Sequence, residues 1–392
     1  MTSRMSQASV EVLVVGGGPA GLYAAHRIAG RGHSVLVCEE HHAVGCPVHC
    51  TGVLATDSFT DFDLPPDVRL NALTAARFVS PSGLMVDYRT PSALATVIDR
   101  VAFDAALAAR AKASGAAISV GARVSSIEPH ATGVTVVAGD SCIQTRLVVL
   151  ACGASYGFQR RFGLGLPIAH LHTAQRELPA TNLGDLELHF GRAVAPDGFA
   201  WVVPVVRREG TYARVGAMAS GDALGAYMRM LARVARPWGV RVDGLPPRQK
   251  VLPLGEIPRT YADRLLVVGD AAGLVKPTTG GGIHYSILSA GLAADVADEA
   301  LRRDRLDAAS LARYEKAWRH HLGEELETQR DLRRVVTALD DAEVDSLFDL
   351  AQTDGIMPLV RKTAQFNQHR HLIRALFKHP PARRILFKTL VG

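Results

Sequence analysis

The sequence predicts an α/β fold that combines a three-layer domain on a parallel sheet, an inserted antiparallel-sheet domain and a helical C-terminal region. Residues 12–15 and 147–150 are unbroken apolar runs, as strands covered on both faces require. A third such run, at 265–268, indicates that the chain returns late to the same sheet. Between these runs, residues 166–251 form short strands of the kind found in antiparallel sheets.

These patterns divide the chain into three parts. We expect a discontinuous parallel-sheet domain at 8–66, 92–165 and 252–300, an antiparallel domain at 67–91 and 166–251, and a helical region at 301–392. A hairpin is expected at residues 77–89, where Pro-Ser-Gly separates two strand-like segments. A helix is expected to open at residues 99–100 and to stop at Gly115.

The first strand leads into a glycine turn and then a helix. Gly16, Gly18 and Gly21 have the spacing G-x-G-x-x-G, which permits a tight turn, close approach of a pyrophosphate and close helix packing. The helix presents free backbone amides to phosphate oxygens at its start, where Pro19 and Ala20 lie. We therefore expect these five residues to contact a dinucleotide.

The second strand, at residues 34–38, ends in two carboxylates. Glu39 lies where a carboxylate that hydrogen-bonds an adenosine ribose is expected, and Glu40 follows it. This first motif allows NAD, NADP or FAD. An ordinary glycine turn in another α/β protein is the alternative interpretation.

A second motif follows the late strand and favours FAD. A carboxylate at the carboxyl end of that strand lies where ligands of such folds bind, and it can accept hydrogen bonds from a ribityl chain. Three consecutive glycines then bring bare backbone against a flat ring, and a helix directs its positive end toward that ring. The expected contacts are Gly269, Asp270, Gly280, Gly281, Gly282 and Ile283. A glycine loop that caps a structural helix is the alternative.

Composition limits the class of protein. With 48% apolar residues and no apolar run long enough to span a membrane, we expect no transmembrane helix. Residues 1–9 are polar and lack the apolar core of a secretory signal. Five cysteines without a regular framework indicate reduced thiols and a cytoplasmic location. Cys46 and Cys50, with His49 between them, lack a second pair of zinc spacing, so we expect no metal.

The formal charge of +6 is concentrated near the C-terminus. Residues 355–392 contain no acidic residue, and their basic residues are Arg361, Lys362, Arg370, Arg374, Lys378, Arg383, Arg384 and Lys388. Apolar residues recur beside them at helical spacing: Leu372, Ile373, Leu376, Phe377, Ile385, Leu386 and Leu390. Peripheral docking on the inner membrane face, binding of an acidic electron carrier and packing against the core are all compatible with this pattern. Nucleic-acid binding is not expected.

With both motifs present, the chain resembles the glutathione-reductase-type FAD fold of the aromatic hydroxylases and their relatives. Residues 47–52 are similar to the P-x-x-C-x-G loop of the geranylgeranyl reductase family. Residues 196–204 resemble its P-x-x-Y-x-W-x-F-P motif, with Phe199 and Val203 at the Tyr and Phe positions. The resemblance covers roughly residues 10–300. It implies a Rossmann-like FAD-binding domain with Arg100 near the pyrophosphate and Asp270 on the ribityl chain.

The resemblance also implies an oxidoreductase that reduces isoprenoid C=C bonds of a lipid, quinone or chlorophyll-type tail by hydride transfer from reduced flavin. Cys50 is the candidate proton donor or substrate-positioning thiol, close to the flavin, and His49 is the other candidate acid. Phe199 and Trp201 lie two apart on a strand and so face one side, where they and Pro204 are expected to contact the apolar substrate. Pro204 is expected to end that strand. A small buried Cys50, a solvent-facing His49 and an ordinary aromatic core are the structural alternatives.

One departure concerns the electron donor. Hydroxylases of this fold carry Asp-Gly after the strand at 147–150, linked to both FAD and NADPH, whereas this chain has Cys152-Gly153. NAD(P)H and a ferredoxin-like protein therefore both remain candidate donors. Three other functions remain open: an FAD-dependent monooxygenase acting on an aromatic or apolar small molecule, a flavin halogenase, and a flavin electron-transfer subunit. The halogenase is considered because residues 199–204 loosely echo W-x-W-x-I-P.

Overall fold

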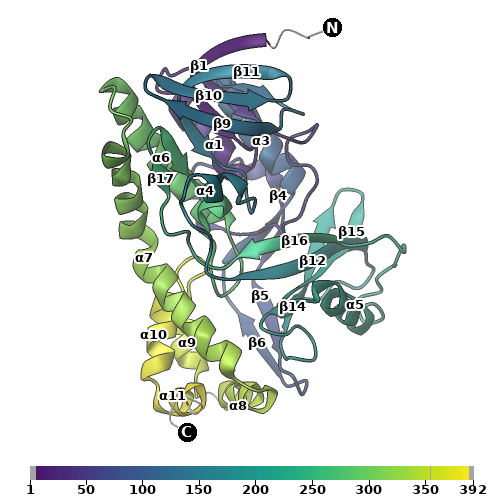
Figure 1. Cartoon of the computed structure of the whole chain (residues 1–392). Helices are drawn as coiled ribbons and strands as arrows, with labels where there is room; N and C mark the ends of the chain where they lie inside the picture. Colours follow the sequence, from purple (N-terminus) through teal and green to yellow (C-terminus); the bar gives the residue numbers. More distant parts are fainter. Residues whose placement is uncertain (1–5, 354, 388–392) are drawn as a thin grey trace.

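The computed structural model describes residues 6–353 and 355–387, so Lys388 and Leu390 of the basic C-terminus lie outside the described residues (Figure 1). An eight-stranded sheet has the order β17-β18-β11-β1-β2-β8, and β10 and β9 extend it from β11. Its strands are β1 Ser6–Val15, β2 Val35–Cys38, β8 Ala117–Ser119, β9 Val124–His130, β10 Gly133–Ala138, β11 Ser141–Leu150, β17 Tyr261–Ala262 and β18 Leu265–Val267. The expected late return is confirmed, because β18 pairs in parallel with β11.

Helices cover the parallel sheet and bury its apolar runs. They are α1 Pro19–Ala29, α3 Arg100–Ala113 and α6 Ile283–Arg302, and α1 contacts both of the others. Asp99 caps α3 by accepting hydrogen bonds from the backbone N–H groups of Val101 and Ala102, which confirms the expected helix start. The short helices α2 Asp57–Asp61 and α4 Gly157–Arg161 lie in connections.

The second sheet has seven strands in the order β16-β12-β15-β14-β13-β5-β6. Its strands are β5 Ala75–Val79, β6 Met85–Arg89, β12 His170–Pro179, β13 Leu186–His189, β14 Phe199–Arg207, β15 Gly210–Ala219 and β16 Arg248–Pro253. Helix α5 Ala223–Val234 packs on one face, through β12, β14 and β15. The opposite face is therefore free to contact the rest of the chain.

Residues 69–73, which we expected in the antiparallel domain, form β4 in a separate small sheet. This sheet has the order β3-β7-β4, with β3 at Val53–Ala55, β4 at Arg69–Leu73 and β7 at Ala95–Ile98. Local sequence does not specify which distant strand a short segment will join. The small sheet connects the glycine-rich loop after β2 to the start of α3.

Strand β14 passes through Pro204, where we expected it to end. On one side, Pro204 pairs with Ala213 of β15. On the other side, β13 pairs with β14 only up to Val202 and does not reach Pro204. Asn71 occupies the open side: its Nδ2 donates to the carbonyl of Pro204 at 3.2 Å, and its Oδ1 accepts from the N–H of Val206 at 3.1 Å. A proline is tolerated here because no neighbouring strand requires its missing N–H.

The C-terminal region consists of the long helix α7 and a group of short helices at its lower end (Figure 1). They are α7 Ala308–Ala338, α8 Asp341–Gln352, α9 Met357–Thr363, α10 Arg370–Lys378 and α11 Pro380–Leu386. Ile373 is buried, Phe377 packs on Phe387, and Arg370 and Arg374 form ion pairs with Glu324 of α7. The apolar residues of the basic segment therefore pack inward. No helix within the two described ranges is long and apolar enough to cross a membrane.

Gly21 and Gly18 give a matched test of the glycine turn. A Cβ at Gly21 would collide with the carbonyl oxygen of Gly16, whereas a Cβ at Gly18 would meet nothing within 4 Å. We expect Gly21→Ala to lower the free energy of unfolding of the ligand-free protein by about 1–3 kcal/mol, because the close packing is lost. Gly18→Ala should leave it nearly unchanged. Equal unfolding free energies in chemical denaturation would contradict this assignment.

Candidate active site

One cavity of about 1430 Å³ extends from the glycine turn to the free face of the seven-stranded sheet. The sequence-predicted residues that line it are Gly16, Gly18, Pro19, Ala20, Glu39, Glu40, His49, Cys50, Arg100, Phe199, Trp201, Asp270, Gly280, Gly281, Gly282 and Ile283. Gly21 and Gly269 are not among the residues that line the cavity. Pro204 also lies outside it, because the side chain of Val203 points into the cavity and successive strand residues face opposite ways. The structure thus brings together, around one cavity, both glycine motifs, the loop at residues 47–52 (the Cys loop) and the strand that carries Phe199 and Trp201.

Glu39 braces the glycine turn. Its carboxylate accepts hydrogen bonds from the backbone N–H of Gly17 at 2.6 Å and of His41 at 2.9 Å. Gly16 has a φ of +107°, and a Cβ there would collide with the backbone of Ala151. The backbone at Gly18 is open to the cavity, so this edge can approach a phosphate closely.

Arg100 lies beside Cys50 on the cavity wall. Its guanidinium forms an ion pair with Asp104 at 2.9 Å, and its buried Nε has no hydrogen-bond partner in the described part of the chain. Burial alone would lower the pKa of Arg100, but Asp104 and Cys50 raise it above its usual value, so the residue stays charged. A buried, unpaired N–H in a cavity suits an anionic ligand oxygen.

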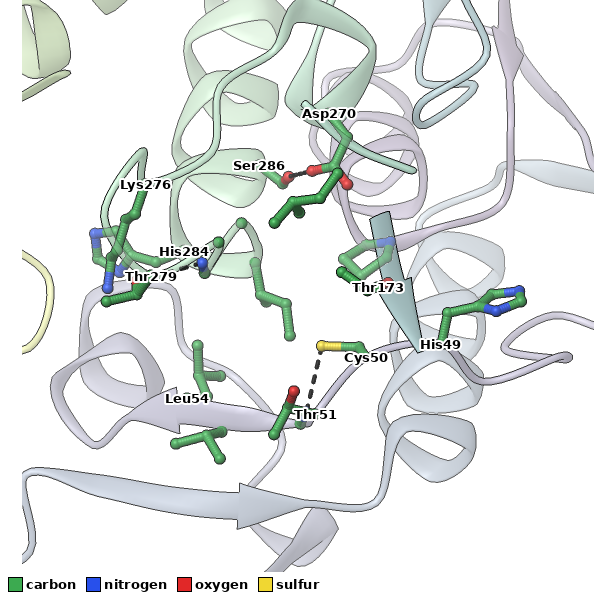
Figure 2. A pocket seen from close by; sticks show the side chains of 18 of the residues that line it. His49, Cys50, Thr51, Leu54, Thr173, Asp270, Lys276, Thr279, His284 and Ser286 are labelled. Atoms are coloured by element: carbon green, nitrogen blue, oxygen red, sulfur yellow. Dashed lines mark hydrogen bonds between the residues drawn. The ribbon is translucent and has the colours of Figure 1, made fainter. Parts of the chain in front are cut away.

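Asp270 stands where the second motif turns from strand to loop. Burial raises the pKa of its carboxyl group, and the charges of Lys250 and Arg100 partly oppose this. Figure 2 shows its hydrogen bond with Ser286, at 3.4 Å. No cation lies at ion-pair distance from it among the described residues, so its oxygens can accept hydrogen bonds from hydroxyl groups of a ligand.

The side chains of the two candidate acids in the Cys loop point in different directions. Figure 2 shows the sulfur of Cys50 pointing toward the middle of the cavity, whereas His49 points the other way. The Sγ atom of Cys50 accepts a hydrogen bond from the N–H of Gly52 at 3.3 Å. Burial, together with Lys250 and Arg248, lowers the pKa of His49 to about 4, so it is neutral near pH 7.

Phe199 and Trp201 share the cavity-facing side of β14, and their ring centroids are 5.9 Å apart. The indole of Trp201 lies across Gly216 of the neighbouring strand, where any Cβ would collide with it. Its Nε1–H reaches Gln175 beyond that glycine and donates a hydrogen bond of 3.2 Å. Gly216 therefore lets a large ring lie flat and form an apolar floor.

Sequence reasoning missed Arg214, which ties the Cys loop to the sheet. This buried residue of β15 donates to Glu177 at 2.6 Å, to the carbonyl of Thr51 at 2.7 Å and to that of Ile98 at 3.1 Å. Thr51 follows Cys50 directly in the sequence. The sequence does contain a sign of Arg214: it is a charged residue on a strand, two positions from Gly216 and therefore on the same face.

A second missed group closes the cavity from the C-terminal side. The Nζ of buried Lys276 donates to the carbonyl of Phe366 at 2.6 Å and to Asn367 Oδ1 at 2.9 Å. Asn367 also contacts His284 Nδ1 at 3.1 Å. Burial lowers the pKa of Lys276 to about 7 and that of His284 to about 4. The segment between α9 and α10 is thereby fixed across the loop of the second motif.

The chain matches the family model described as lycopene cyclase protein over residues 11–353. It is 30% identical to digeranylgeranylglycerophospholipid reductase 2 of Methanothermobacter thermautotrophicus, over 96% of this chain and 98% of that protein. It is also 30% identical to the digeranylgeranylglycerophospholipid reductase of Methanocaldococcus jannaschii, over 88% of this chain and 92% of the relative.

Solved structures show the same fold. A geranylgeranyl bacteriochlorophyll reductase-like protein of Thermoplasma acidophilum superposes with a TM-score of 0.84 at 24% identity, over 98% of this chain and 99% of that one. A flavin-dependent brominase superposes with a TM-score of 0.69 at 15% identity, over 98% of each chain. The chain is an oxidoreductase with the fold of flavin-dependent enzymes, and it belongs to the geranylgeranyl reductase family.

Proposed function

We propose that this enzyme binds FAD and reduces isoprenoid C=C bonds in the apolar tail of a lipid, quinone or chlorophyll-type molecule. The observation that carries the proposal is the single cavity that joins the glycine turn to the apolar floor formed by Phe199 and Trp201. A dinucleotide and a long apolar chain can meet in such a space. Relatives named digeranylgeranylglycerophospholipid reductases support the same chemistry.

The residues of the cavity fit FAD. The open backbone at Gly18 and the unpaired Nε of Arg100 suit its phosphates, and Asp270 suits the ribityl chain. Glu39 is near the expected ribose position, and the bare backbone at 280–282 suits the flat ring. When bound, reduced FAD supplies a hydride from N5.

The chain itself must bind the alkene, exclude water and provide a proton. Trp201 and Phe199 hold the apolar tail, and the segment fixed by Lys276 covers the cavity. The Cys50 thiol would donate its proton to the alkene carbon that does not take the hydride. Solvent would then return a proton to the sulfur of Cys50.

The electron donor and the membrane contact are less constrained. Burial raises the pKa of Cys152 to about 11, so this residue is uncharged and does not replace the aspartate found there in hydroxylases. NAD(P)H and a ferredoxin-like protein are the two candidate donors. Peripheral attachment to a lipid surface accords with an isoprenoid substrate.

Oxygen dependence tests the reaction class. The flavoprotein reduced with dithionite under anaerobic conditions should be reoxidised by a polyprenyl lipid, and the lipid should gain two hydrogen atoms per reduced bond by mass spectrometry. Reoxidation that occurs only with oxygen and yields an oxygenated or halogenated product would contradict the proposal. Reoxidation only by a protein partner would instead indicate an electron-transfer subunit.

Cys50→Ser should slow lipid reduction by about 100-fold, because the better proton donor is lost. Flavin content, measured by absorbance, should not change. Cys142→Ser is the matched control, since Cys142 is also partly buried but lies outside the cavity lining. Equal turnover of the two variants would remove Cys50 from the reaction.

Arg214→Lys should lower kcat by about 10- to 100-fold, because a lysine cannot hold both backbone carbonyls and the Cys loop shifts. The reaction rate of Cys50 with a thiol reagent should rise in the same variant. Arg77→Lys is the control: Arg77 lies on the same seven-stranded sheet and pairs with Asp87, but it contacts neither Glu177 nor the Cys loop. Identical Cys50 reactivity in both variants, with thermal melting as a check of folding, would show that Arg214 does not position the thiol.

A further inference from the structure

His284 lies where the second glycine motif passes into helix α6. It follows Gly282 by two positions and lines the same cavity as Asp270. A Cβ at Gly282 would lie 2.8 Å from Oδ1 of Asp270, so the start of α6 adjoins the carboxylate that suits a ribityl chain. Figure 2 shows His284 beside Lys276 at one side of this space. The imidazole therefore borders the place that we expect the flat ring to occupy.

A chain of hydrogen bonds determines which nitrogen of His284 carries the proton. The Nζ of Lys276 donates to the carbonyl of Phe366 and to Oδ1 of Asn367, at 2.6 and 2.9 Å. The Nδ2 donor of Asn367 must then face the other way, where Ser58 Oγ lies at 3.2 Å and Nδ1 of His284 at 3.1 Å. Because Nδ1 faces a donor it accepts, and the proton of the neutral ring is on Nε2.

Ser58 and Phe62 hold the imidazole in this arrangement. The Oγ of Ser58 lies 2.9 Å from Nδ1 of His284, so this hydroxyl can donate to the nitrogen while it accepts from Asn367. The ring packs on that of Phe62, with centroids 4.9 Å apart. Burial, together with the charge of Lys276, lowers the pKa of His284 to about 4, so the ring is neutral near pH 7.

The Nε2–H group of His284 remains available to a ligand. It forms no hydrogen bond with any residue in the described ranges, although the side chain lines the cavity. An N–H group beside a cavity can donate to an oxygen or nitrogen atom of a ligand there. The positive end of α6 is at the same place, so both features favour negative charge on that ligand.

We propose that His284 donates a hydrogen bond from Nε2 to the pyrimidine edge of bound FAD, and that Asn367 and Lys276 are positioning residues that keep the proton on that nitrogen. The donor stabilises the negative charge that reduction places on the pyrimidine ring, as preorganised donors stabilise an oxyanion. It therefore raises the midpoint potential of the flavin. This inference rests on the proposed function for the presence of FAD, but not for the identity of the substrate.

NMR of the histidine ring nitrogens tests the positioning role. In the flavoprotein, Nδ1 of His284 should be unprotonated and Nε2 protonated, and the loss of these signals in His284→Gln assigns them. Asn367→Asp should place a proton on Nδ1, because a carboxylate oxygen then accepts where the amide donated. A protonated Nδ1 in the wild type, or an unprotonated Nδ1 in Asn367→Asp, would overturn the positioning role.

The midpoint potential of the bound flavin tests the contact itself. His284→Leu removes the donor, so the ratio of reduced to oxidised flavin at the wild-type midpoint should fall about tenfold, a shift of about 30 mV for two electrons. His284→Gln should restore most of the potential, since its amide can also donate. The control is His371→Leu, which changes an exposed histidine of α10 outside the cavity lining and should have no effect.

An unchanged potential in His284→Leu, or equal losses in the leucine and glutamine variants, would refute the hydrogen bond. If His284→Leu does not retain flavin, the wild type decides the question: reduction with dithionite should shift the Nε2–H resonance, and identical resonances in the two redox states refute the contact. A flavoprotein that meets these expectations but reduces no polyprenyl lipid would overturn the proposed function alone. A protein that binds no flavin would overturn both.

Discussion

The buried guanidinium of Arg214 joins the seven-stranded sheet to the Cys loop and to β7 of the small sheet, and the geometry of the site depends on it. A buried cation is expensive unless its charge and its donors are satisfied, and here Glu177 supplies the charge while two backbone carbonyls take the other donors. Those carbonyls belong to Thr51 and Ile98, which adjoin the segments that carry Cys50 and Arg100. A single side chain of the seven-stranded sheet thus bonds both the Cys loop and the end of β7.

The consequence is a fixed relation between the cavity wall that carries Cys50 and Arg100 and the wall that carries Phe199 and Trp201. Arg207 adds a second link, because it bonds both Glu177 and Asp99, the cap of α3. Hydride transfer requires close and fixed approach of two carbon or nitrogen centres, and small displacements are costly. A site divided between two domains meets this requirement only if the domains cannot rotate freely. The buried Arg–Glu network provides that restraint.

The parts of the site that the sequence could predict are those with local rules. The G-x-G-x-x-G spacing located the glycine turn, the capping position of Asp99 located α3, and a period of two placed Phe199 and Trp201 on one face. Pairing between distant strands follows no such local rule, which is why β4 joined another sheet and why Pro204 stayed within β14. Arg214 and Lys276 were missed for the same reason: their partners lie far away in the chain.

The basic C-terminal segment combines internal packing with exposed positive charge. Its apolar residues pack inward around Ile373, and Arg370 and Arg374 form ion pairs with Glu324. Much of the amphipathic surface of the segment therefore contacts the rest of the protein. At the cavity itself, Lys250 of the edge strand β16 is exposed and has no ion-pair partner among the described residues. Arg361, Lys362, Lys378, Arg383 and Arg384 have no carboxylate partner in the described part of the chain, so the segment packs through its apolar side and still presents positive charge at the surface.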